Sequence, residues 1–223
     1  THMGNLIRMP YSEVTATLEI LERLGVEPEH LTRMRADQSR AKLVADALVS
    51  VPTPKWREEN GIIYFFVTSD GTTGEQWITH LEKQNFRVSD YAKSVLNSDK
   101  FQPTKGVTTE IAVLKGMLWN DSDRITKNIR AEADKRNLTK PNAEVACLIR
   151  EKFSDKEIES MGLWWIITMH DPIKDSGGDP RLLSAYRDGD GRWLDAHWDD
   201  PGHGWDRESG FAFAVSSSFA KAS

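Results

Sequence analysis

Polar side chains between residues 184 and 209 carry the groups in this sequence that could bind a ligand or move a proton. The segment SAYRDGDGRWLDAHW, residues 184–198, alternates along much of its length and places Ser184, Tyr186, Asp195 and His197 on polar positions. Hydroxyl, carboxylate and imidazole groups can serve in acid–base catalysis, coordinate a metal or form hydrogen bonds with a ligand. Their spacing has to decide among these three kinds of site.

The spacing argues against catalysis and against a metal site. Six histidines are present and none forms a His-x-x-x-His pair, so we do not expect His170 or His197 to bind zinc. The turns DSGGDP and DGDGRWLD lack the alternating oxygen ligands and the final Glu of a calcium loop. No nucleophile elbow, phosphate loop or zinc signature occurs, and the single cysteine, Cys147, falls on the apolar side of a predicted helix. We therefore predict no enzyme, no cofactor and no metal.

Alternation of polar and apolar residues predicts a β-hairpin. With Asp190–Gly191 as a two-residue turn, Ser184 pairs with His197 and Tyr186 pairs with Asp195, and these four side chains share one face. Moving the turn by two residues, to 188–189, would leave the faces unchanged. The opposite face is apolar and can cover a core; it holds Leu183, Ala185, Ala196 and Trp198.

The polar face has no residue that the fold requires. A solvated strand face is polar in most proteins, so this mixture is either an ordinary surface or a ligand-binding surface. The following loop, DDPGHGWDRESG, continues the mixture with His203, Asp206 and Ser209, while Trp205 is suited to anchor the loop by burial.

The rest of the chain has to position this hairpin. It has 223 residues, 39% hydrophobic, with a net charge of −5 and no apolar stretch long enough to cross a membrane. No signal peptide is visible, so the compartment is undetermined and cytoplasmic by default. Helical spacing predicts helices over residues 11–49 and from 108 to 161, and the prolines and charges of VPTPKWREENG predict a boundary between them. IIYFFVT and LWWIITMH read as buried strands.

The C-terminal stretch LLSAYRDGDGRWLDAHWDDPGHGWDRESGFAFAVS resembles the variable region of proteins diversified by diversity-generating retroelements. In that family a reverse transcriptase copies a template with errors at adenines and writes the copy over the 3′ end of the gene. Asn codons are the main targets, and errors at both adenines give Asp, His, Tyr, Ser and Gly. The variable region sits on a C-type lectin fold and closes with a GF strand, which Gly210 and Phe211 match. LWWIITMHDPI and IIYFFVTSDGTTGEQWI resemble the central strand and the first strand and helix of that fold.

The resemblance implies an α+β protein with a C-type lectin-like domain and a C-terminal antiparallel sheet. We expect an N-terminal helical segment over residues 1–55 and the lectin-like domain over 56–223, with a helical insertion at about 105–160 and a variable ligand-binding region at about 181–215. The expected partner is a variant-specific ligand, a protein rather than a nucleic acid. The expected contact positions are Ser184, Tyr186, Asp188, Asp195, His197, Asp199, His203, Asp206 and Ser209. The expected scaffold residues are Leu183, Trp193, Trp198, Trp205, Phe211 and Phe213, with Trp193 also suited to be a binding anchor. Because contact side chains should not support the fold, replacing Tyr186 or His197 with Ala should leave the melting temperature nearly unchanged.

Two alternative functions remain open at this level. LEILERLGVEPEHLTRMR, residues 18–35, reads as a helix-turn-helix, which would make the protein a DNA-binding regulator. The acidic balance argues against it, since Arg33, Arg35 and Arg40 are too few to dominate. An enzyme of the lectin-fold oxidase type would need a reactive cysteine or a metal in the terminal sheet, and Cys147 lies outside that sheet.

Overall fold

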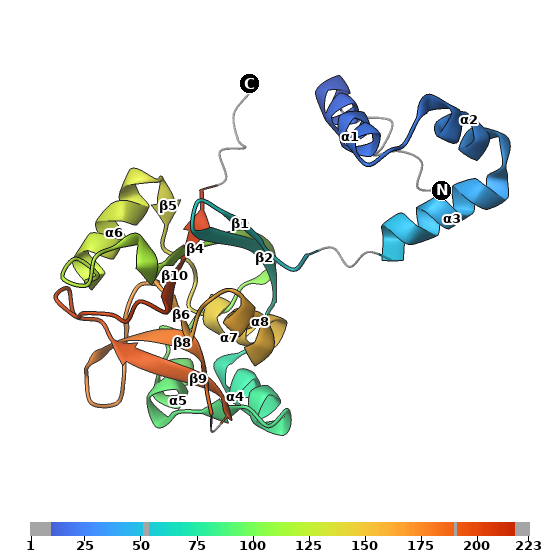
Figure 1. Cartoon of the computed structure of the whole chain (residues 1–223). Coiled ribbons are helices and arrows are strands. Elements are labelled where there is room, and N and C mark those ends of the chain that lie inside the picture. Colours follow the sequence, from blue (N-terminus) through green and yellow to red (C-terminus); the bar gives the residue numbers. More distant parts are fainter. Residues whose placement is uncertain (1–9, 51–53, 190, 217–223) are drawn as a thin grey trace, which may run out of the picture. The chain divides into compact units, whose positions relative to one another are not determined.

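The chain divides into two compact units, Thr1–Pro54 and Lys55–Ser223, which we describe separately (Figure 1). The structure is a computed structural model and describes residues 10–50, 54–189 and 191–216. The division falls within the proline-containing segment that the sequence suggests as a boundary.

The first unit consists of α1 (Tyr11–Arg23), α2 (Pro28–Ala36) and α3 (Gln38–Ser50). Helix α2 begins at a proline, which suits the first turn because its missing N–H would have no partner there. Its N-terminus is closed by a capping box between Glu27 and His30. The Asp37 carboxylate accepts hydrogen bonds from the backbone N–H and the hydroxyl of Ser39, and so starts α3.

The second unit is built on one ten-stranded sheet within the described residues, in the order β1-β2-β4-β10-β6-β8-β9-β3, with β5 paired to β10 and β7 to β8. All pairs are antiparallel except β6 with β10 and β3 with β9. The strands are β1 (Arg57–Glu59), β2 (Ile62–Asp70), β3 (Arg87–Val88), β4 (Lys105–Lys115), β5 (Leu138–Thr139), β6 (Trp165–Thr168), β7 (Ile173–Lys174), β8 (Pro180–Asp188), β9 (Gly191–Trp198) and β10 (Ser209–Val215). Together with its helices this sheet confirms the predicted α+β class.

Two hydrophobic clusters cover the two faces of the sheet. The larger one joins one face to side chains of α4, α5, α7 and α8, including Trp77, Leu81 and Ile158. The smaller one joins the other face to α6 through Ile129 and Ala133. The helices are α4 (Gly74–Lys83), α5 (Asp90–Leu96), α6 (Thr126–Lys135), α7 (Val145–Lys152) and α8 (Asp155–Ser160), with a short 3-10 turn η2 (Gly116–Leu118). The sheet is therefore a middle layer, buried on both sides over much of its area.

The predicted helical insertion at 105–160 is wrong in its first part. Residues 105–115 form β4, which lies in the sheet between β2 and β10. Its run Ile111 to Leu114 is buried on both faces, so it carries no alternation and reads as readily as a buried helix. Part of the predicted boundary segment is also structured, because β1 pairs with β2 and Trp56 packs against Phe153.

The hairpin is present, with a register between the two that the sequence allows. Ser184 pairs with Asp195, and Tyr186 pairs with Trp193. Strand β9 already begins at Gly191, so the predicted turn at 190–191 is wrong; Asp190 itself lies outside the described residues. The shift is two residues from the predicted pairing, and each side chain therefore keeps its predicted face.

Candidate functional site

Five aromatic side chains cover the face of the hairpin that carries the predicted contact positions. Tyr186 stacks on Trp165 with ring centroids 3.6 Å apart and planes 9° from parallel. The His197 ring stands edge-on between Trp165, at 4.9 Å, and Trp205, at 5.5 Å, and His203 packs against Trp205 at 4.5 Å. We call Trp165, Tyr186, His197, His203 and Trp205 the aromatic cluster. This face of the hairpin is therefore partly covered rather than open to solvent.

The aromatic cluster follows from strand pairing and from one anchored loop. Trp165 of β6 pairs directly with Tyr186 of β8, which puts both rings on the same face of the sheet. The loop between β9 and β10, residues 199–208, contributes two more members of the cluster, His203 and Trp205. Its Trp205 is buried, and the indole N–H donates to the Thr126 hydroxyl at 3.0 Å. The backbone N–H of Thr126 in turn donates to the carbonyl of His203, which ties the loop to the start of α6.

Two of the predicted contact residues, Ser184 and Ser209, are buried, so the prediction that they lie at the surface is wrong. Ser184 has no exposed surface, because β8 is an interior strand and its partner in β6, Ile167, lies in the smaller core. Ser209 is 2% exposed at the start of β10, where it pairs with Trp165. Neither hydroxyl can therefore contact a ligand while the sheet is intact.

The predicted scaffold residues are buried with two exceptions. Trp205, Leu183, Phe211 and Phe213 all lie in the cores. Trp198 is 49% exposed and belongs to neither cluster, because it is the last residue of β9 and the core does not reach that end of the strand. Trp193 is half-buried, with the Arg87 guanidinium 5.2 Å from its ring centroid.

The Ser184, Asp195 and His197 side chains lie on one face but do not form a catalytic triad. The Ser184 hydroxyl and the His197 Nε2 both lack hydrogen-bond partners among the described residues, whereas a triad needs a nucleophile bonded to its base. Asp195 Oδ1 instead accepts from the backbone N–H of Ala196 at 2.8 Å. Burial lowers the pKa of His197, and nearby His203 and Arg181 act in the same direction against the opposing effect of Asp195. The imidazole is therefore neutral at pH 7 and held by ring contacts.

The other predicted positions differ in how much of them a ligand could reach. The Asp199 carboxylate is 10% exposed and binds Nη2 of Arg130 with both oxygens at 2.9 Å, so it serves the fold. Asp206 is exposed, and four more positions are half-buried: Tyr186, Asp188, Asp195 and His203. These five form what we call the accessible set.

Trp165 is the residue of this site that the sequence analysis misses. It reads as one more apolar residue of a buried strand in LWWIITMH. The alternation of side chains along β6 places Trp165 on the same face as Ile167. That face carries the polar positions of β8, so the alternation could have identified Trp165. The missing knowledge was that β6 pairs with β8.

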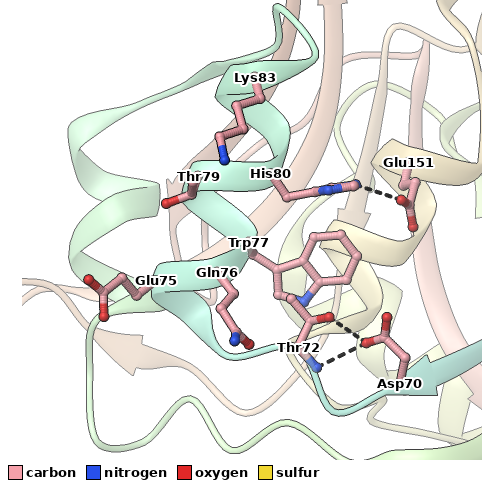
Figure 2. Close-up of a pocket in the computed structure, with 9 residues that line it drawn as sticks. All are labelled: Asp70, Thr72, Glu75, Gln76, Trp77, Thr79, His80, Lys83 and Glu151. Atoms are coloured by element: carbon pink, nitrogen blue, oxygen red, sulfur yellow. Dashed lines mark hydrogen bonds and ion pairs between the residues drawn. The ribbon is translucent and has the colours of Figure 1, made fainter.

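A separate hollow of about 530 Å³ lies on α4 (Figure 2), and no residue of the accessible set lines it. Its walls come from the end of β2, from α4 and from α7. His80 Nε2 lies 2.7 Å from Glu151 Oε1, and Asp70 accepts two hydrogen bonds from Thr72, which lower the pKa of that carboxyl. The Trp77 indole is buried at its base. The side chains of this hollow can form hydrogen bonds with a small molecule, but no predicted contact position lines the hollow.

The described part of the chain contains no group of three His, Cys, Asp or Glu side chains placed to hold a metal ion. Cys147 is buried in α7, and burial raises the pKa of its thiol, which opposes a role as a nucleophile. Among the described helices none is long and apolar enough to span a bilayer. Comparison with protein-family models, with curated proteins and with solved structures found no match to this chain.

Proposed function

We propose that the second unit is a C-type lectin-like domain that binds a variant-specific protein ligand without catalysis. The binding surface is the accessible set. Adenine-directed retroelement mutagenesis diversifies its members other than Tyr186, whose ring is stacked on Trp165. The observation that carries the proposal is the anchored loop 199–208. Trp205 holds this loop against the hairpin, so that His203 meets the same ring as His197 of β9.

The backbone beneath these positions supports such a use. Eight residue pairs join β8 to β9, and β10 closes the variable region between β4 and β6 in the interior of the sheet. A surface whose residues are exchanged one by one needs a main-chain conformation that does not depend on those side chains. The backbone hydrogen bonds between the strands hold the main chain in this way. Tyrosine, aspartate and histidine also suit a protein-binding surface, since tyrosine gives contact area at low entropic cost.

Exchange with asparagine, the residue expected in a retroelement template, tests the proposed surface. A triple variant, Asp195→Asn, His203→Asn and Asp206→Asn, should keep the free energy of unfolding within about 1 kcal/mol of the original. The matched control is Ser184→Asn, which enlarges a buried side chain and should cost about 2–3 kcal/mol. If the triple variant loses as much as the control, these side chains belong to the fold and the proposed surface is wrong.

Sequencing the DNA around the gene tests the diversification itself. The proposal expects a reverse-transcriptase gene nearby and a near-copy of the 3′ end that differs mainly at adenines. A neighbourhood with neither would refute diversification, and the exchange experiment would then decide whether the surface survives as an ordinary binding site.

The DNA-binding alternative stays a prediction, with less support than the binder. Helices α1 and α2 do cover the segment that reads as helix-turn-helix. The negative charges of Glu29 and Asp37, however, lie beside Arg33 and Arg40 and offset the attraction of these arginines for phosphates. Binding to a DNA duplex with a steep salt dependence would favour this alternative.

A further inference from the structure

The three helices of the first unit leave many of their apolar side chains exposed to solvent. Within residues 10–47, no described side chain is buried. Isolated helices of 9 to 13 residues are marginal in water, and so small a unit needs disulfides, a metal or a partner to be stable. The large exposed apolar residues are Tyr11, Val14, Leu18, Ile20, Leu24, Leu43 and Val44.

Helices α1 and α2 form the walls of an apolar groove of about 480 Å³. No residue of α3 lines this groove, so the third helix of the same chain does not fill it. Two carboxylates, Glu22 and Glu27, stand among the lining residues and give the groove an acidic rim. Its apolar lining includes Leu18, Leu21, Val26 and Leu31.

Helix α3 has the complementary features. Leu43 is 69% exposed and Val44 is 43% exposed, which makes an apolar ridge. Arg40 and Lys42 flank that ridge with positive charge. Their ion pairs within the helix region are solvent-exposed, and exposed pairs of this kind contribute little and exchange readily with other acids.

We propose that α3 of a second copy of this chain docks in the groove between α1 and α2. Leucine and valine of one copy fill the apolar lining of the other, and the basic flank meets the acidic rim. Each copy carries both the groove and the ridge, and in the proposed dimer the exchange is reciprocal, which gives it two-fold symmetry. The dimer also presents two ligand surfaces, so a weakly binding accessible set gains avidity on a multivalent target. Only that consequence rests on the proposed function.

The mass of the full chain in solution tests the dimer directly. Light scattering after size exclusion should give twice the chain mass of 25.3 kDa. Leu43→Asp should weaken association by roughly 100-fold or more, since it places a charge in a dry groove. Met117→Asp, which changes an apolar residue of the other unit that is 50% exposed, should leave the dimer intact. A wild-type chain that stays monomeric across the micromolar range overturns the proposal.

Charge reversal distinguishes reciprocal docking from nonspecific hydrophobic association. Glu22→Lys alone, or Arg40→Glu with Lys42→Glu, puts like charges at both contacts and should weaken the dimer about tenfold. Mixing the two variants restores opposite charges at one contact and leaves the other native, so a heterodimer should form. If the mixture associates no better than either variant alone, α3 does not dock in the groove.

Discussion

Removing the Tyr186 ring decides whether the polar face of the hairpin is independent of the fold. The sequence leads us to expect no effect on melting, whereas the structure stacks this ring on Trp165 at 3.6 Å. A stacked aromatic pair contributes about 0.5–1.5 kcal/mol beyond burial. Removing a half-buried ring loses about 2 kcal/mol more of apolar burial. Tyr186→Ala should therefore lower the free energy of unfolding by about 3 kcal/mol.

Urea unfolding at pH 7, with thermal melting alongside, measures this loss. For a unit of this size about 3 kcal/mol corresponds to a fall of roughly 6–12 °C in melting temperature. A double-mutant cycle with Trp165→Ala should recover a coupling of about 1 kcal/mol between the two rings. Asp206→Ala is the control, because its side chain is exposed and should change the stability by less than about 0.5 kcal/mol.

The opposite result has an equally clear meaning. A Tyr186→Ala protein that melts within 1 °C of the original, with no coupling to Trp165, would refute the reasoning from the stack. Tyr186 would then be as replaceable as Asp206, and the sequence-based expectation for this position would stand.

Three further predictions concern the cores. Burial lowers the pKa of His170 to about 4 from 6.5, and the Nε2 of this neutral ring accepts a hydrogen bond from the backbone N–H of Leu183. The contribution of His170 to the free energy of unfolding is therefore complete above pH 6.5. It falls by about 3 kcal/mol as the pH drops to 4, because the unfolded chain takes up the proton first. Urea titrations should show that loss in the original and not in His170→Gln, which keeps an acceptor without titrating. Because burial raises the pKa of the Cys147 thiol, iodoacetamide should label it only after unfolding, as read by mass spectrometry; labelling of the native protein at the rate of a free thiol would contradict this. A Cβ at Gly74 would overlap the backbone carbonyl of Leu96, so Gly74→Ala should cost about 2 kcal/mol in urea unfolding, whereas Gly189→Ala, in open space, should cost much less.

Local patterns were sufficient for the hairpin and insufficient for its surroundings. Alternation and a turn signal identify β8 and β9, but two successive Asp-Gly pairs leave the register ambiguous, and the structure takes a pairing between the two options. The apolar run at 111–114 fits a helix as well as a strand, because a strand buried on both faces shows no period of two.

The candidate site required knowledge that the sequence pattern does not contain. Ser184 has the parity of a surface residue, and only the pairing of β8 with β6 on its far side buries it. The coverage of His197 depends on Trp205, which comes from a loop tied to α6. Both facts arise from contacts between segments distant in the chain, so parity along one strand could not reveal them.

The same contacts restrict how a diversified surface could be built on this scaffold. Positions whose side chains stabilise the sheet cannot be exchanged freely, since a loss of about 3 kcal/mol is a large fraction of the stability of a typical domain. The scaffold therefore separates into a covered strip along β6 and β8, where Ser184 and Tyr186 meet neighbours, and a rim that holds Asp195, His203 and Asp206. Because the loop 199–208 is anchored through Trp205 and through backbone hydrogen bonds to α6, residues on either side of that anchor can change while the loop stays in place. A ligand that used this rim would be recognised by side chains whose positions are set by the sheet and by the anchored loop.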